Sequence, residues 1–226
     1  MSTTPRILAV DVSGPGGGAA LLRPGALDWA RLPDGEARAK SLTKLLAGLL
    51  ERAGLAPREL DAVACGVGPG SFTGIRIGVA TAGAFAYAAG LPAIGVGSLD
   101  GIVENAPADA DDVLVALDAR RGRLFAARFR RRGGAWEGAG PYENAPPAEL
   151  ASALPASAFV LGDARARYPD AFGRFRGSAH SPPRPDAIAR IAATRFAAGE
   201  RPDPLALRPL YLRPSEPEII RAERSG

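Results

Sequence analysis

Between Ala64 and Gly78 the chain joins the end of a strand, a glycine-rich turn and the start of a helix within fifteen residues. Residues 61–67 are apolar enough for a short buried strand, and Gly68-Pro69-Gly70 accepts backbone angles that most residues avoid. Ser71 is a residue type that caps helix N-termini. The segment therefore predicts a strand followed at once by a helix, which is the basic unit of an α/β protein.

This strand–turn–helix join has two interpretations. Free amides and the helix dipole converge where a helix begins, so such a turn can bind a phosphate. It is not a P-loop, because no lysine follows the second glycine, and Thr73 stands where a dinucleotide fingerprint has its third glycine. A structural turn and a phosphate-binding turn both stay open. Under the second interpretation, the nucleotide-binding residues are Asp11, Ser13, Gly68, Gly70, Ser71 and Thr73.

Composition excludes several kinds of site. A chain of 226 residues with 46% hydrophobic residues can bury a substantial core. One cysteine (Cys65) and one histidine (His180) provide neither an internal disulfide nor a histidine-based metal cluster, so no metal site is expected. The uncharged stretch from Arg76 to Asp100 is rich in Ala and Gly and is broken by Gly90-Leu91-Pro92, which argues against a membrane span. With no signal-like start, a cytoplasmic location is expected.

Positive charge is the one unusual feature of composition. The formal net charge is +4 and only two residues, Lys40 and Lys44, are lysines. An arginine cluster between residues 120 and 132 predicts either a surface for nucleic-acid phosphates or a solvated hairpin. The second is favoured because no aromatic residues alternate with the arginines for base stacking. The cluster consists of Arg120, Arg121, Arg123, Arg128, Arg130, Arg131 and Arg132.

Two helices are expected in the first half. The first has a leucine face at Leu42, Leu45, Leu46, Leu49 and Leu50, with the spacing of one helical side. The second, from Ser71 towards Gly90, has small residues every fourth position, so that side can pack closely on another helix or on its own sheet.

A short repeat indicates two related lobes. Residues 7–11 and residues 114–118 are both apolar strands that end in an aspartate, and each is followed by a polar turn and a second apolar strand. We expect an N-terminal α/β lobe over residues 1–105 and a smaller C-terminal α/β lobe over residues 112–226. The second includes a helix at 185–198 and a Pro-rich tail that packs back on the first lobe. In a two-lobed nucleotide enzyme, Asp11 and Asp118 would hold a metal-bound phosphate between the lobes.

Five motifs together resemble the TsaB (YeaZ) family. They are Val10–Ser13, Gly66–Gly78, Ile94–Leu99, Leu117–Gly122 and Pro209–Arg213. The resemblance covers most of the chain and implies an actin-like, Hsp70-like fold of two related lobes. It also implies a role in making N6-threonylcarbamoyladenosine (t6A) beside the anticodon of certain tRNAs. Two departures stand out: Glu36–Ser41 lacks the histidine common in the family, and Ser13–Gly18 is unusually rich in glycine.

The family resemblance further implies that the chain has no catalytic residues of its own. It would serve a catalytic paralogue, TsaD, with the ATPase TsaE joining the complex and a TsaC-type enzyme supplying threonylcarbamoyl-adenylate. Docking would use the two helices of the first lobe, with the interface residues Leu42, Leu45, Leu46, Leu49, Gly74, Ile75, Gly78, Val79 and Ala82. Transfer RNA would be reached through the complex, ATP or ADP would lie at the interface with partners, and the chain alone would form a homodimer. The alternative is an autonomous ATPase or phosphotransferase of the actin-like fold, using Asp11, Asp118 and the turn at 68–73.

Overall fold

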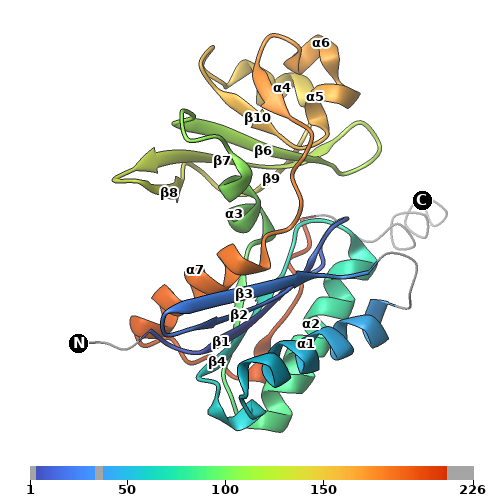
Figure 1. Ribbon diagram of the computed structural model, residues 1–226. Coiled ribbons are helices and arrows are strands. Elements are labelled where there is room, and N and C mark those ends of the chain that lie inside the picture. The colour runs from blue at the N-terminus through green and yellow to red at the C-terminus, as the bar shows by residue number, and fades with distance from the viewer. Residues whose placement is uncertain (1–3, 34–37, 213–226) are drawn as a thin grey trace, which may run out of the picture.

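The computed structural model describes residues 4–33 and 38–212, with only the backbone at residue 38. Two lobes are stacked one above the other, each built on a mixed β-sheet (Figure 1). The segment Glu36–Ser41, which departs from the family pattern, lies partly outside the described residues. The tail beyond residue 212 lies wholly outside them. No helix in the described ranges combines the length and the apolar character needed to cross a membrane.

The sheet of the first lobe has the strand order β3-β2-β1-β4-β5. The first three strands are antiparallel neighbours, whereas β4 and β5 run parallel to β1. Its strands are β1 (Ile7–Asp11), β2 (Gly18–Arg23), β3 (Ala26–Arg31), β4 (Ala62–Gly66) and β5 (Ala93–Val96). Helices α1 (Arg38–Ala53) and α2 (Phe72–Ala89) cover one face, and a short 3-10 turn, η1 (Pro57–Glu59), precedes β4.

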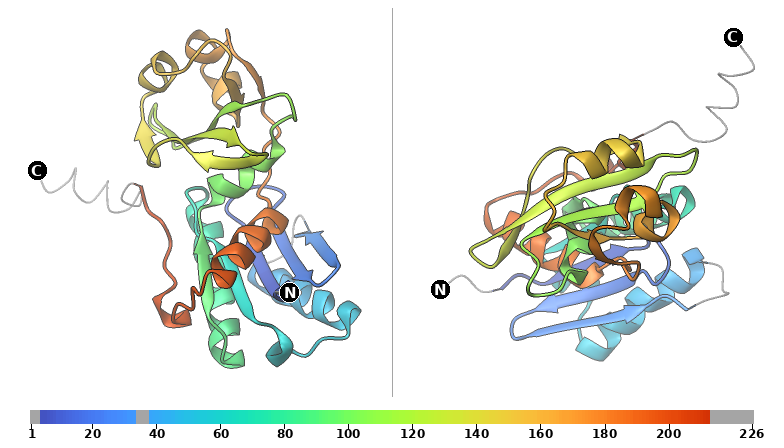
Figure 2. Two further views of the ribbon diagram at one scale, coloured as in Figure 1. Left: turned by 90° about the vertical axis from the view of Figure 1, so that its left-hand side faces the viewer. Right: turned by 90° about the horizontal axis from the view of Figure 1, so that it is seen from above.

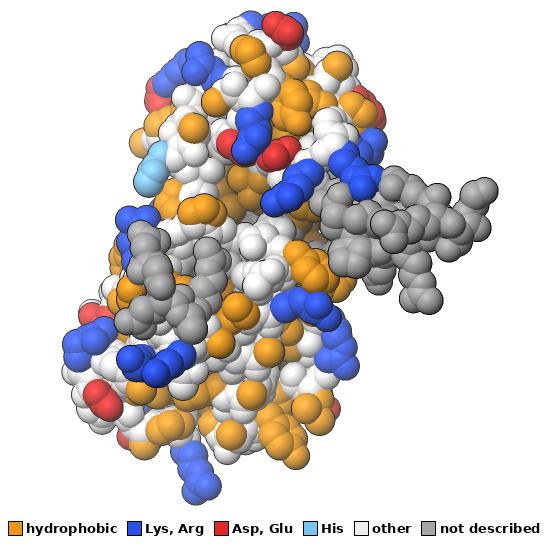
Figure 3. Space-filling model, turned by 90° about the vertical axis from the view of Figure 1, so that its right-hand side faces the viewer, with side chains coloured by type: hydrophobic (Ala, Val, Ile, Leu, Met, Phe, Trp, Pro, Cys, Tyr) orange, Lys and Arg blue, Asp and Glu red, His pale blue; other side chains and the backbone are white. Residues whose placement is uncertain are grey.

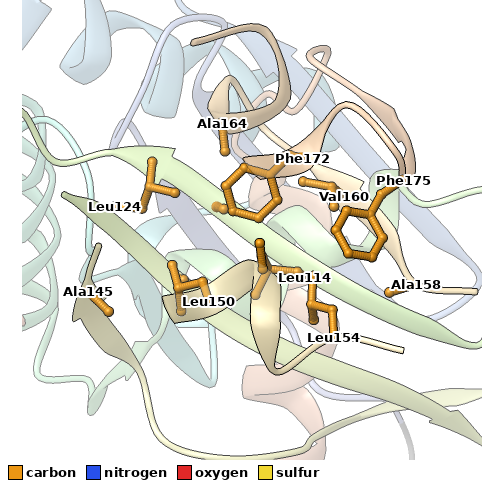
Figure 4. Packing of buried hydrophobic residues seen from close by; sticks show 13 residues of the cluster. Leu114, Leu124, Ala145, Leu150, Leu154, Ala158, Val160, Ala164, Phe172 and Phe175 are labelled. Carbon is orange, nitrogen blue, oxygen red and sulfur yellow. The ribbon is translucent and has the colours of Figure 1, made fainter. Parts of the chain in front are cut away.

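The sheet of the second lobe repeats this arrangement in the order β8-β7-β6-β10-β11, with β9 pairing with β7. Its strands are β6 (Asp112–Asp118), β7 (Leu124–Arg132), β8 (Ala135–Gly138), β9 (Glu143–Ala145), β10 (Phe159–Leu161) and β11 (Arg176–Ser178). One face is covered by α4 (Pro147–Ser152), α5 (Ala164–Arg167) and α6 (Pro169–Phe172), and Leu150, Phe172 and Phe175 pack there on Leu114, Leu124 and Val160 (Figure 4). The matching strand order confirms the duplication indicated by the repeated strand and aspartate.

Each sheet is covered on its second face by the helix that follows the other sheet. After β5, α3 (Ser98–Ile102) and η2 (Val103–Asn105) pack under the second sheet, with Leu99 against Val113 and Phe129. After β11, α7 (Pro185–Ala197) returns to the first sheet, as Figure 1 and the left view of Figure 2 show. Because α3 and α7 also contact each other, the exchanged helices tie the lobes together.

The predicted boundary of the second lobe is therefore wrong beyond β11. Ile188 and Ala192 of α7 are fully buried against Ile7 and Ala64, because the apolar face of the first sheet opposite α1 and α2 needs a cover. The chain then passes through η3 (Pro204–Ala206) and continues along α2, where Leu207 joins the core. This last part, as far as residue 212, does pack on the first lobe, in agreement with the prediction for the tail.

The predicted cap and stop of α2 are confirmed. Ser71 is the N-cap and its Oγ accepts a hydrogen bond from the Gly74 amide at 3.3 Å. Gly90 ends the helix in the left-handed conformation, with a φ of 71°. The two helix faces that were candidates for a partner, however, are turned inwards. The leucines of α1 lie against the first sheet, and the small residues of α2 lie against β1 and β4.

Candidate functional site: the cleft between the lobes

A cavity of about 800 Å³ lies between the lobes. It is lined by the β1–β2 loop, the turn before α2, the β6–β7 loop, the connection at residues 179–183 and the end of the described chain at residues 210–212. Figure 3, which views this side, shows basic side chains at the waist between the lobes. The cleft therefore brings together the two hairpin turns that the sequence repeat singled out.

Asp11 sits behind the wall of this cleft and holds three segments together. Its Oδ1 accepts hydrogen bonds from the Ser13 amide (3.0 Å) and from Ser98 Oγ (3.3 Å), and Ser98 Oγ in turn accepts from the Gly68 amide (3.0 Å). The carboxyl is fully buried, and this desolvation raises its pKa despite the hydrogen bonds. Its Oδ2 has no partner among the described residues. Asp11 therefore fixes the turn before α2 rather than facing the cavity.

Asp118 repeats the hairpin turn of Asp11 in the second lobe. Its Oδ1 accepts from the Arg120 amide at 3.0 Å, as Asp11 accepts from the amide two residues on. Unlike Asp11 it reaches the cavity, where Arg167 lies 3.6 Å from it and also bonds Asp163 at 2.7 Å. In the parts of the chain that the structure describes, no three His, Cys, Asp or Glu residues are grouped as metal ligands would be. The two aspartates thus cap equivalent turns in the two lobes.

Positive charge without a counterion faces the cavity from both lobes. Arg31 lies at the end of β3 in the first lobe, and Arg120 lies in the β6–β7 loop of the second. Within residues 4–33 and 38–212 neither guanidinium has a hydrogen-bond or ion-pair partner. The N-terminus of α2 opens into the same cavity through Ser71 to Thr73, and a helix N-terminus attracts anions. The chemistry that this arrangement supports best is anion binding.

The predicted nucleotide-binding residues divide into two groups. Ser13, Gly70, Ser71 and Thr73 line the cavity, whereas Asp11 and Gly68 stand behind its wall. The main residues that the sequence prediction missed are Arg31, Phe72, Asp163, Arg167 and Tyr211. Phe72 and Tyr211 lie within the motifs Gly66–Gly78 and Pro209–Arg213, and Asp163 follows the strand end at Leu161, whereas Arg31 and Arg167 had no local signal.

None of the predicted partner-interface residues is on the exposed surface. Leu42, Leu46, Leu49, Gly74, Ile75, Gly78, Val79 and Ala82 are buried, and Leu45 is partly buried against the same core. The prediction failed because periodicity finds the apolar face of a helix but not what covers it. Beyond the exposed Arg76, the outward face of α2 is nevertheless made of small and apolar residues. They are Ala80, Ala84, Tyr87 and Ala88, and Tyr87 is 64% exposed.

No nucleophile and activating base are brought together in the described residues. Cys65 is buried in the first sheet, and burial raises the pKa of its thiol, which keeps it protonated. His180 lines the cavity in an exposed loop, where its backbone amide donates to Ser178 Oγ.

Comparisons with known proteins point in one direction. A family model described as TsaD, tRNA N6-adenosine threonylcarbamoyltransferase, matches residues 35–162. An uncharacterized protein of Mycobacterium tuberculosis is 35% identical over 213 residues, which cover 92% of this chain and 91% of that protein. The tRNA threonylcarbamoyladenosine biosynthesis protein TsaB of Escherichia coli is 34% identical over 136 residues, 59% of each chain. YeaZ from Pseudomonas aeruginosa superposes with a TM-score of 0.82 at 27% identity, covering 92% of this chain and all of that one.

Proposed function

Because the chain belongs to the TsaD family of tRNA threonylcarbamoyladenosine proteins, on its TsaB (YeaZ) branch, we propose that it is a non-catalytic partner subunit in t6A synthesis. Its role is to dock and support the catalytic paralogue TsaD. The observation that carries this role is the exposed stripe of Ala80, Ala84 and Ala88 on α2, with Tyr87 beside it. Participation in t6A biosynthesis itself agrees with the names of its TsaB relatives.

The docking face is the outward side of α2. Ala80, Ala84 and Ala88 recur every fourth residue, so they form one exposed stripe, and Tyr87 lies beside it. Small residues allow another helix to approach closely, while an exposed tyrosine provides a large apolar contact with a polar tip. Apolar burial contributes about 25 cal/mol per Å², so a few such side chains decide association. The same face would pair two copies in the absence of the paralogue.

The other members of the complex extend this proposal. TsaE is the ATPase that joins it, and a TsaC-type enzyme supplies threonylcarbamoyl-adenylate. Transfer RNA is reached through the assembled complex. ATP or ADP would be shared with a partner rather than held tightly by this chain, since Asp11 is enclosed and unable to contact a nucleotide in the cleft.

Co-elution with the paralogue tests the docking face. Ala84→Arg places a long charged side chain in the exposed stripe and is expected to abolish co-elution on size exclusion. Ala156→Arg, on an exposed turn of the second lobe, is the matched control and should co-elute as wild type does. Both variants should keep the wild-type circular dichroism spectrum. Co-elution of Ala84→Arg with unchanged affinity would reject this face.

Variants at Leu46 or Gly78 are unsuitable for this purpose. Both residues are buried in the first lobe, so a charged substitution there would disturb folding before docking. ATP hydrolysis by the isolated chain, measured with magnesium and no partner, separates the proposed role from that of an autonomous ATPase. We expect none above the level without enzyme.

A further inference from the structure

We propose that the mouth of the interlobe cleft binds a single strand of RNA, with backbone phosphates on Arg31 and Arg120 and a base stacked on the Phe72–Tyr211 pair. The inference rests on the proposed function in one respect, since that function brings RNA to the complex. It assigns direct RNA contact to this chain.

The charge distribution favours a polyanion at the second lobe. Residues 112–178 contain eleven arginines and no lysine against seven acidic residues, so they carry the whole net charge of +4. The rest of the chain has equal numbers of basic and acidic residues. Several of these arginines are neutralised locally, as where Arg128 and Arg130 share Asp112. The field is therefore strongest where the guanidinium groups have no counterion.

Among the described residues, two arginines without a counterion line the cleft, together with Arg167, which pairs with Asp118 and Asp163. Arg31 and Arg120 face it from opposite lobes, and neither has a partner in the described part of the chain. Arg120 adopts the left-handed conformation, with a φ of 64°, which a non-glycine residue rarely does. A free guanidinium on each side of one cavity offers two separate contacts for the phosphates of a strand.

An exposed aromatic pair stands at the same mouth. Phe72 and Tyr211 both line the cavity, and their rings stack with centroids 5.3 Å apart at 28°. They are 39% and 47% exposed, and the Arg76 guanidinium lies 4.8 Å from the Phe72 centroid. Exposed aromatic faces beside arginines are the usual platform for unpaired bases, since every base has a π-face.

The size of the cavity selects a single strand over a duplex. At about 800 Å³ it lies within the range of pockets that enclose a small ligand, so it accepts one or two nucleotides. Proteins read RNA mainly at single-stranded loops, whose bases can turn outwards. The expected ligand is therefore an unpaired loop or strand of RNA.

Fluorescence anisotropy with three labelled RNAs tests the proposal on the full chain, alone and with its paralogue. The probes are a hairpin with a seven-nucleotide loop, a single-stranded 12-mer and a fully paired duplex. We expect the hairpin and the single strand to bind at least fivefold more tightly than the duplex. Affinity should fall as salt rises, with a slope of about 0.7 for each phosphate contacted.

Four variants separate the parts of the site. Arg31→Gln and Arg120→Asn should each weaken binding at least threefold and reduce the salt slope; asparagine tolerates the left-handed backbone. Tyr211→Ala should weaken binding at least fivefold with the salt slope unchanged, because stacking is not ionic. Arg132→Ala is the control, because Arg132 is exposed and pairs with Glu137. It should change RNA affinity less than twofold.

Specific outcomes overturn the inference. One is absence of RNA binding at low salt by both the free chain and the complex, and another is equal loss of affinity in Arg132→Ala. Competition by ATP or pyrophosphate with no effect of Tyr211→Ala would indicate a small-anion site instead. If Tyr211→Ala loses co-elution with the paralogue but keeps RNA binding, the pair contacts protein. All four variants are expected to co-elute with the paralogue as wild type does. Failure of the RNA-binding proposal is therefore distinguishable from failure of the α2 docking face.

Discussion

Two glycine-to-alanine substitutions in α2 should change stability in opposite directions. A Cβ added at Gly74 would overlap the carbonyl oxygen of Val12 and lie 3.2 Å from its carbonyl carbon. That oxygen belongs to backbone at the end of β1, so it cannot move aside as a flexible side chain would. A Cβ added at Gly83 finds its nearest neighbour, the Pro204 oxygen, at 3.5 Å, which is an ordinary contact.

The expected magnitudes follow from these contacts. Alanine is preferred to glycine inside a helix by about 1 kcal/mol. At Gly83 this gain is retained, so Gly83→Ala should stabilise by about 0.5–1 kcal/mol. At Gly74 it is offset by overpacking, which costs about 3 kcal/mol at the upper end of the usual range, leaving a net loss of about 2 kcal/mol. The two variants should then differ by about 3 kcal/mol.

Urea unfolding followed by far-UV circular dichroism measures this difference. The midpoints should lie on opposite sides of the wild-type midpoint with unchanged slopes. In thermal melts, at about 2–4 °C per kcal/mol for a chain of this size, they should be separated by about 6–12 °C. A Gly74→Ala variant as stable as Gly83→Ala would refute the packing of α2 on β1 described above.

Three further predictions concern buried polar groups. Burial raises the folded-state pKa of Asp11, so its carboxyl costs stability as pH rises above the ordinary value of 3.8, where the unfolded chain ionises first. Asp11→Asn should therefore gain stability relative to wild type as pH rises above that value, measured in urea melts. Asp186 is buried and accepts hydrogen bonds from the Arg184 guanidinium at 2.7 and 2.8 Å, which lower its pKa. Asp186→Asn should therefore lower the free energy of unfolding by about 1–3 kcal/mol at pH 7. The stability difference between wild type and variant should shrink as pH falls through the folded-state pKa of Asp186. Cys65 is buried and its thiol is protonated, so it should react with a maleimide only as fast as the protein unfolds around it. The extent of labelling at pH 8 should follow the urea unfolding transition. Rapid labelling of the native protein would contradict the burial of Cys65.

Local features of this protein were predictable from sequence because they depend on residues close together in the chain. The Ser71 cap, the stop at Gly90 and the strands of the first hairpin each follow from a few neighbouring residues. The repeat of strand and aspartate likewise predicted the duplicated sheets. The short elements β8, β9, α4, α5 and α6 were missed, because three to six residues give too little periodicity to recognise.

Only the tertiary structure decided which partner each surface meets. The leucine face of α1 was visible in the sequence, but whether Leu46 met a partner or its own sheet was not. The same holds for α7, where the apolar side of Ile188 does not specify which of two sheets it covers. Arg31 and Arg120 lie eighty-nine positions apart and face one cleft only because the two sheets stack. A pattern of apolar residues determines that a face is buried, whereas the identity of the covering surface depends on contacts between distant segments.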